Sequence, residues 1–263
     1  MIKGRYKRIV AYGCSFTAGD ELPDAEVLGM REEDVDSLKR SGITREELYG
    51  RKHAAAVRAG KDLTWVRWLA DKCQVSYSNR AVGGGSIEQM IFRIERDYRI
   101  GKISDDDLVL VGLTSMYRWF QFDNKGAEHS WVFSYSLDKI SEMNDALVKY
   151  YVNDYNIIWR YYSLLNYLQM LSEKHSNIKM VHAISPFSCE KEFIVDNNKL
   201  DPNFKKMIDS FEITNIINKN WGMGDLYSHI PKEESTHGWG HPKIKYQKEF
   251  ANLLYHLIEA EDD

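Results

Sequence analysis

Short apolar runs rich in β-branched residues recur at wide intervals along this chain, each bounded by polar or turn-forming residues. The runs are residues 8–12, 75–79, 107–113 and 178–184. Runs of this length and composition predict buried strands. The segments between them carry helical periodicity, clearest over residues 63–72 and 154–174. Strands that alternate with helices predict an α/β fold, a three-layer α/β/α sandwich with a parallel, flavodoxin-like doubly wound sheet.

Two segments interrupt this alternation and are interpreted as insertions. Residues 21–61 are charged and weakly apolar; they contain the capping-box pattern of Thr44 and Glu47, and Gly42 is placed to end a preceding helix. Residues 188–236 are polar and poor in strand signals. We expect residues 1–263 to form one domain, with a helical insertion at about 21–61 and a loop-rich insertion at about 188–236.

Composition narrows the class of protein. With 35 basic and 39 acidic residues, the formal charge of -4 gives no general attraction for nucleic acid. Three cysteines without a CxxC spacing favour a reducing compartment and argue against zinc held by thiolates. The basic N-terminus precedes too short an apolar stretch for a signal peptide, and no run approaches the roughly 20 apolar residues of a membrane helix. We expect a cytoplasmic protein with no membrane partner.

Candidate chemistry begins where the first apolar run stops. Ser15 follows that run in the sequence Tyr-Gly-Cys-Ser-Phe-Thr, which predicts a tight turn that lifts the serine above the end of a strand. Residues 83–85 are three glycines that follow the second run and precede Ser86. Glycines let backbone N–H groups approach a ligand closely and bind an oxyanion.

Two further positions complete the set. Thr114 follows the third run, with the cation of Arg118 a turn later, and His241 precedes Pro242 at the start of the last amphipathic segment. Pro242 is expected to be the first residue of that helix. Open parallel sheets bind ligands at the carboxyl ends of their strands, so these positions are expected to converge.

The ordered set of motifs resembles the SGNH, or GDSL-type, hydrolase superfamily, and within it most closely uncharacterised members carried by large tailed phages. The resemblance covers nearly the whole chain. It implies ester hydrolysis with Ser15 as the nucleophile and His241 as the base. It also implies an oxyanion hole formed by the backbone N–H groups of Ser15 and Gly84, with Thr114 at the third position.

The departures from the family pattern concern the same site. Cys14 replaces the aspartate of the Gly-Asp-Ser-Leu block, Thr114 replaces an asparagine, and Gly238 stands three residues before His241 where the family has its acid. Loss of the acid partner of a catalytic histidine costs about 10⁴ in rate in serine proteases. A main-chain carbonyl or a carboxylate from elsewhere is an alternative partner. The candidate carboxylates are Asp225, Glu233 and Glu234.

Other features of the sequence argue against alternative functions for these residues. The glycine run lacks the Gly-Lys-Ser/Thr of a phosphate loop, which argues against nucleotide binding. His237 and His241 have the spacing of zinc ligands on a helix, but glycines and a proline between and after them disfavour a helix, so we expect no metal and no cofactor. Cys14 is expected to point away from Ser15. His182, inside a predicted strand, is interpreted as a core or surface group.

The leading hypothesis is therefore hydrolysis of a small acyl ester, such as an O-acetyl group on a carbohydrate. Arg118, His237 and Ser86 are candidates for binding the substrate or orienting the catalytic groups. A sugar hydroxyl in place of water would make the same site an O-acyltransferase. The rival hypotheses are a catalytically degenerate scaffold that binds a partner, and a phage accessory protein whose insertions make the contacts. The oligomeric state is not predicted.

Overall fold

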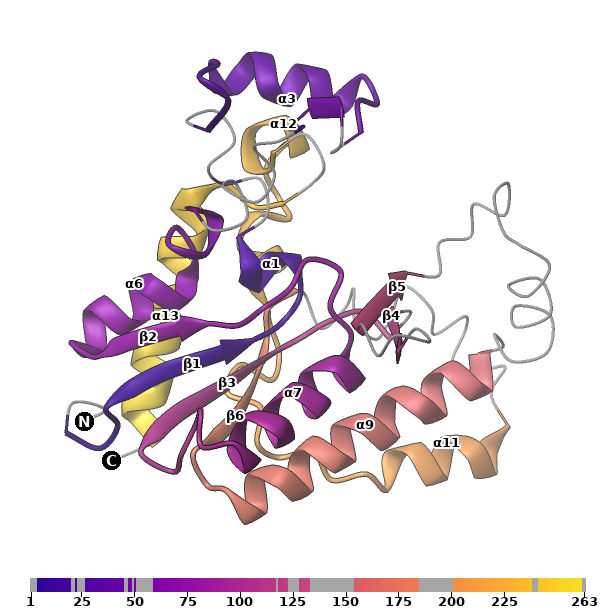
Figure 1. Ribbon diagram of the computed structural model, residues 1–263. Coiled ribbons are helices and arrows are strands. Elements are labelled where there is room, and N and C mark those ends of the chain that lie inside the picture. Colours follow the sequence, from indigo (N-terminus) through magenta and orange to yellow (C-terminus); the bar gives the residue numbers. More distant parts are fainter. Residues whose placement is uncertain are drawn as a thin grey trace.

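The computed structural model describes residues 4–19, 22, 27–44, 47–48, 50, 59–116, 118–122, 128–132, 154–184, 201–237 and 241–261. Its centre is a four-stranded sheet in which every neighbouring pair of strands is parallel (Figure 1). The strand order is β2-β1-β3-β6, and the strands are β1 (Arg8–Tyr12), β2 (Ser76–Asn79), β3 (Asp107–Leu113) and β6 (Ile178–His182). The predicted α/β class and parallel sheet are confirmed.

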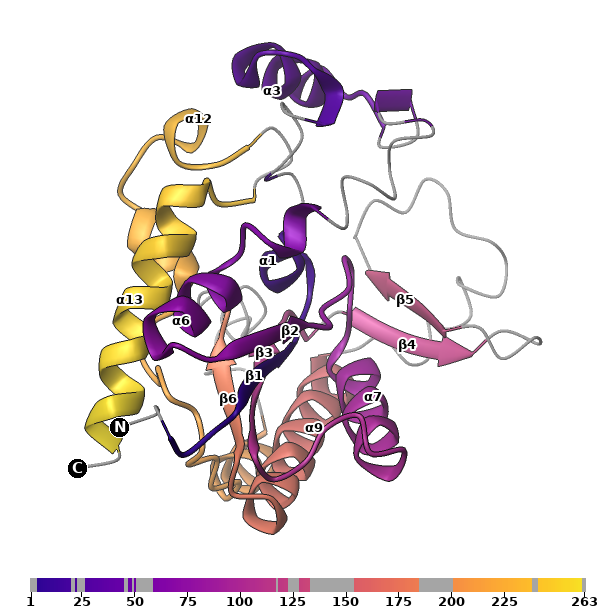
Figure 2. The same cartoon turned by 60° about the vertical axis from the view of Figure 1, so that its left-hand side comes forward.

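Helices cover both faces of the sheet (Figure 2). On one face lie α6 (Trp65–Cys73) and α13 (Ile244–Glu261), and on the other α7 (Ile87–Arg99) and α9 (Asp154–Lys174). Alternate strand residues serve the two cores: Val10 and Tyr12 pack on the α7 and α9 side, whereas Ile9 and Ala11 pack on the α6 and α13 side. Burial on both faces explains why the strands read as continuous apolar runs.

A short extended segment beyond β6 extends the sheet by one rudimentary strand. Ile216 pairs with Met180 in a parallel bridge. The next contact is made by a side chain: the Asn218 amide accepts a hydrogen bond from the His182 N–H at 2.9 Å and donates one to the His182 carbonyl at 3.1 Å. An asparagine side chain thus stands in for a backbone peptide in the ladder.

The sequence analysis did not predict the antiparallel hairpin of β4 (Arg118–Phe122) and β5 (Glu128–Val132). The hairpin follows β3 and lies beside α7 (Figures 1 and 2). Glu128 holds it there, because its carboxylate pairs with the guanidinium groups of Arg93 at 2.5 Å and Arg96 at 3.0 Å on α7.

Within the first insertion, α3 (Glu32–Arg40) forms the expected helix. Gly42 follows its end with φ +94°, and its N–H donates to the carbonyl of Lys39. The predicted capping box is present: Thr44 N–H donates to Glu47 Oε2 at 2.8 Å, and Glu47 N–H donates to Thr44 Oγ1 at 3.3 Å.

The second insertion contains the short helices that the sequence predicts, although residues 185–200 lie outside the described residues. The helices are α11 (Pro202–Asp209), the 3₁₀ helix η4 (Met223–Tyr227) and α12 (Lys232–Ser235). The expectation that Pro242 starts the last helix is wrong: Pro242 forms an antiparallel bridge with Thr236, and α13 begins at Ile244. None of the described helices is long and apolar enough to cross a membrane.

Candidate active site

Ser15 lies at the carboxyl edge of the sheet, as the first residue of the four-residue helix α1 (Ser15–Ala18). Cys14 is extended and caps this helix, and its carbonyl accepts hydrogen bonds from the N–H groups of Thr17 and Ala18 at 3.0 and 2.8 Å. Gly19, at φ +79°, ends it. The central strand β1 therefore turns sharply into a helix whose first residue is the candidate nucleophile.

Two glycines allow α1 to lie directly over the strand ends. A Cβ at Gly13 would be 2.3 Å from Thr17 Oγ1, and a Cβ at Gly112, on β3, would be 2.4 Å from the same atom. Contacts this short do not occur between real side chains. Only glycine fits at either position while Thr17 keeps its place.

The glycine loop after β2 is hydrogen-bonded to the backbone just before Ser15. Val82 N–H donates to the Gly13 carbonyl at 3.0 Å, and Gly85 N–H donates to the Val82 carbonyl at 2.9 Å. Gly84 has φ +77°, a backbone conformation that residues other than glycine rarely adopt. The loop that carries Gly84 is thus fixed against the turn that carries Ser15.

Asn79, at the end of β2, is a positioning residue that the sequence analysis missed. Its side-chain Nδ2 donates to the carbonyl of Thr17 at 2.6 Å and to Thr64 Oγ1 at 3.1 Å. It therefore ties α1 to the start of α6. A polar residue at the end of a predicted strand was the available signal. Ser86 has a structural role as the N-cap of α7, where its hydroxyl accepts from Gln89 N–H at 3.3 Å.

Thr114 follows β3 at the same edge and is fully buried. Its hydroxyl makes no hydrogen bond within the described part of the chain. Buried hydroxyl groups without a partner are unusual in proteins, so Thr114 offers an uncommitted donor beside the strand ends.

His241 reaches this edge from the far end of the chain. Its ring centroid lies 5.3 Å from that of Phe16, the residue after Ser15. The loop that carries it is closed by three contacts: the Thr236–Pro242 bridge, His237 N–H to the His241 carbonyl at 2.8 Å, and Lys243 N–H to the Ser235 carbonyl at 3.1 Å. We call residues 235–243 the histidine loop.

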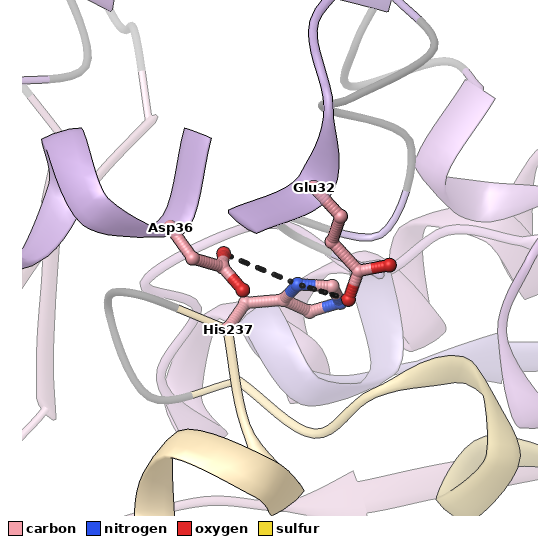
Figure 3. A group of neighbouring side chains, drawn as sticks. All are labelled: Glu32, Asp36 and His237. Carbon is pink, nitrogen blue, oxygen red and sulfur yellow. Dashed lines mark ion pairs between the residues drawn. The ribbon is translucent and has the colours of Figure 1, made fainter. Parts of the chain in front are cut away.

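Helix α3 contacts the histidine loop through the acidic side chains of Glu32 and Asp36, which lie beside the ring of His237 (Figure 3). Nδ1 of His237 lies 3.4 Å from Asp36 Oδ1 and 3.8 Å from Glu32 Oε1. The side chains of Asp36 and His237 are only 4% and 7% exposed, whereas that of Glu32 is 51% exposed. The ring of His237 thus makes one buried contact, with Asp36, and one contact near the surface, with Glu32.

The same three residues have the composition of a metal site, with their ligand atoms within 4.8 Å of one another. Two lysines compete with this interpretation: Lys243 Nζ lies 3.4 Å from Glu32 Oε1, and Lys39 Nζ lies 3.9 Å from Asp36 Oδ1. Two ammonium groups already offset the two carboxylates, so a divalent cation would enter a site without net negative charge. We therefore interpret the cluster as an ion-pair network that clamps α3 to the histidine loop.

The carboxylates considered as the missing acid have separate placements. Asp225 Oδ2 accepts from Gly222 N–H at 2.7 Å at the start of η4. Glu234 is exposed, and the position of the Glu233 side chain, like Gly238, lies outside the described residues. Asp225 is also close enough to His182 to favour its charged form, but burial prevails and lowers the pKa of His182 to about 4. His182 is therefore a neutral core histidine at neutral pH.

Comparison with known proteins gives structural likenesses only. No family model matches the chain, and no curated protein matches it. Among solved structures it is similar to the psychrotrophic esterase EstA from a Pseudoalteromonas species, with 14% identity, a TM-score of 0.47, and coverage of 97% of this chain and 98% of the other. A catalytic mutant of Axe2, an acetylxylan esterase from Geobacillus stearothermophilus, has 10% identity, a TM-score of 0.49, and coverage of 98% and 96%. A member of the lipolytic G-D-S-L family from Veillonella parvula has 13% identity, a TM-score of 0.46, and coverage of 96% of both chains.

Proposed function

We propose that this protein is a serine ester hydrolase of the SGNH type that cleaves small acyl esters, such as O-acetyl groups on a carbohydrate. The observation that carries the proposal is the approach of two distant segments to Ser15. The Gly84 loop is hydrogen-bonded to Gly13 on one side, and the His241 ring packs against Phe16 on the other. These two approaches to the turn that carries Ser15 support the proposal that nucleophile, oxyanion donors and base act together at this edge of the sheet.

In the proposed mechanism, Ser15 Oγ attacks the ester carbonyl while His241 accepts its proton. The backbone N–H groups of Ser15 and Gly84 stabilise the tetrahedral oxyanion, and the uncommitted hydroxyl of Thr114 is the third donor. His241 then protonates the leaving alcohol. Water, activated by the same histidine, releases the acyl group; a sugar hydroxyl in its place would transfer that group instead.

The proposal assigns the orientation of His241 to the histidine loop, since Gly238 provides no carboxylate. His237 N–H holds the His241 carbonyl at 2.8 Å, and the His237 ring faces Asp36 and Glu32 of α3. In this scheme the insertion fixes the loop, and Asp36 acts on the base as a positioning residue through His237.

A fluorophosphonate probe that reacts with activated serines tests the proposal. We expect labelling of the wild-type protein and turnover of 4-nitrophenyl acetate, both lost in Ser15→Ala. His241→Asn should lose both as well while remaining folded by circular dichroism. Cys14→Ala is the matched control, because it removes the neighbouring nucleophile; it should keep its labelling. Labelling that survives in Ser15→Ala would refute the assignment.

One observation favours a second candidate function. Gly238 in place of the family's acid is also what a scaffold that binds without turnover would show. Absence of labelling in the folded wild-type protein, together with absence of turnover, would favour that binding scaffold, such as a phage accessory protein.

A further inference from the structure

Arg118, the first residue of β4, carries a guanidinium group of which two nitrogen atoms have no hydrogen-bond partner in the described part of the chain. The residue is half-buried, and its Nε and Nη1 atoms are closed off from solvent. Neither atom makes a hydrogen bond, and no carboxylate among the described residues forms an ion pair with it. Its backbone N–H donates to the Ser115 carbonyl at 3.2 Å.

Other partly buried arginines in the described part of the chain are neutralised. Arg8 pairs with Asp107 at 2.7 Å, Arg80 pairs with Asp97, and Arg160 pairs with Glu88. Burial of a charge costs several kcal/mol unless it is paired and hydrogen-bonded. Arg118 therefore destabilises the fold unless an anion binds to it.

The backbone of Arg118 is held close to the start of α7, in the segment that follows β3. Arg160 donates to the carbonyls of Met116 at 3.2 Å and Arg118 at 2.9 Å, and it also pairs with Glu88 in the first turn of α7. Arg118 thus starts β4 next to the beginning of α7, four residues after Thr114 (Figures 1 and 2).

We propose that Arg118 binds an oxyanion group of the ligand, a carboxylate or a phosphate. A guanidinium group presents a planar fork of donors that matches both groups and forms strong charge-assisted hydrogen bonds with them. Where the proposed function holds, the substrate is an ester of an acidic molecule, such as an acylated acidic sugar, and Arg118 selects it. The anion site itself does not depend on Ser15 being a nucleophile.

Thermal unfolding with and without an anion is the first test. In sodium chloride alone, Arg118→Met should raise the melting temperature by roughly 2–4 °C, because it removes an unpaired charge. Arg160→Met is the matched control; it breaks a paired guanidinium and should lower the melting temperature. A lower melting temperature for Arg118→Met would show that Arg118 is structural and would overturn the proposal.

Anion titration at constant ionic strength is the second test. Sodium phosphate or sodium acetate, exchanged for sodium chloride, should raise the melting temperature of the wild-type protein and leave that of Arg118→Met unchanged. The anion with the larger effect identifies a phosphate or a carboxylate ligand. An equal response in both proteins, or no response in either, would overturn the proposal.

Variants at Ser15 separate this inference from the proposed function. Ser15→Ala should keep the anion response even if no ester is ever hydrolysed. If turnover is found, Arg118→Met should lower the ratio of kcat/KM for 4-nitrophenyl hemisuccinate to that for 4-nitrophenyl acetate at least tenfold, with Arg118→Lys restoring part of it. An unchanged ratio would refute the role in substrate selection.

Discussion

The two halves of the candidate site are joined to neighbouring segments mainly by different kinds of contact, although the Asn79 side chain also ties α1 to Thr64 and backbone hydrogen bonds also close the histidine loop. On the serine side, backbone hydrogen bonds join the strand ends: Arg80 N–H to the Ala11 carbonyl at 2.8 Å and Val82 N–H to the Gly13 carbonyl at 3.0 Å. On the histidine side, side-chain contacts join the loop to α3: His237 Nδ1 lies 3.4 Å from Asp36 Oδ1, and Lys243 pairs with Glu32 at 3.4 Å.

This contrast separates the parts of the site that depend on the fold from those that depend on particular side chains. Backbone hydrogen bonds between neighbouring loops can form with many sequences, provided that glycine occupies the positions where a Cβ atom would clash. Ion pairs depend on the identity of each partner, on pH and, where exposed, on salt. The geometry of the serine side therefore depends mainly on the fold of the sheet, whereas the attachment of the histidine loop depends on side chains of α3.

The largest effect on fluorophosphonate labelling is expected from Gly13→Ala, which displaces the helix that begins at Ser15. The added Cβ would lie 2.3 Å from Thr17 Oγ1, so α1 must shift. We expect a loss of roughly 1–3 kcal/mol in unfolding free energy from overpacking. A shift of about 1 Å in catalytic geometry costs about 10²-fold, so fluorophosphonate labelling should slow by that factor. Urea unfolding and labelling rates measure the two effects.

Thr17→Ala provides the control for this variant. Alone, it removes a buried hydroxyl that has no hydrogen bond among the described residues, so it should change stability little. Combined with Gly13→Ala it removes the closest contact and should recover part of the labelling rate. Independent, additive losses in the double variant would show that the Gly13–Thr17 contact does not position Ser15.

The next effect concerns the stability of the folded chain at acid pH. The pKa of His182 is lowered from 6.5 to about 4 by burial. A base with a lowered pKa in the folded state leaves stability intact above pH 6.5 and reduces it as the pH falls toward 4. The loss reaches about 3 kcal/mol at the lower end. Urea unfolding as a function of pH measures it.

His182→Phe removes this proton linkage and keeps a planar ring in a site where Nδ1 makes no hydrogen bond. The variant should retain more stability at pH 4.5 than the wild-type protein does, relative to pH 7.5. Parallel stability curves for the two proteins would mean that His182 takes up its proton without unfolding.

The sequence predicts those elements of the fold that are held in place by the burial of apolar residues. All seven residues of β3 are buried, and the observed strand has the predicted bounds, as does α9. The rudimentary strand at Ile216 was missed because Asn218 pairs through its side chain, in a segment whose polarity resembles a loop. The β4–β5 hairpin was missed because ion pairs from α7 to Glu128 hold it.

The candidate site divides in the same way. A glycine and a serine at a strand end predict the placement of Ser15 and of the Gly84 loop, since strand ends of a parallel sheet share an edge. The clamp of Asp36 on His237 was not predicted. The two residues are about 200 positions apart, and a charged helix in an insertion reads as a solvated surface. Pairing between distant charged residues leaves no periodic pattern in a single sequence.

A smaller effect is expected from Asp36→Asn, which weakens the buried contact of the histidine side. Hydrogen bonds and ion pairs of buried charged groups contribute about 1–3 kcal/mol, so a loss in that range is expected. Hydrogen exchange should accelerate in residues 235–243 and stay unchanged in residues 80–86. Asp34→Asn is the matched control, because Asp34 is on the same helix, is 45% exposed and pairs only locally with Arg31. Equal hydrogen exchange of residues 235–243 in the two variants would show that Asp36 does not hold the histidine loop in place.

The smallest effect is expected from Glu32→Gln, which removes the exposed end of the network. Glu32 is 51% exposed, and partly exposed ion pairs contribute about 0–1 kcal/mol, so unfolding free energy should fall by less than about 1 kcal/mol. Salt should mimic the substitution, because the Debye length falls from about 10 Å at 0.1 M to about 3 Å at 1 M. Exchange of residues 235–243 in the wild-type protein should therefore approach that of Glu32→Gln at high salt, whereas the backbone-bonded residues 80–86 should not respond. If both segments respond equally to salt, the two halves of the site are held by the same forces, and the contrast between backbone and side-chain control does not hold.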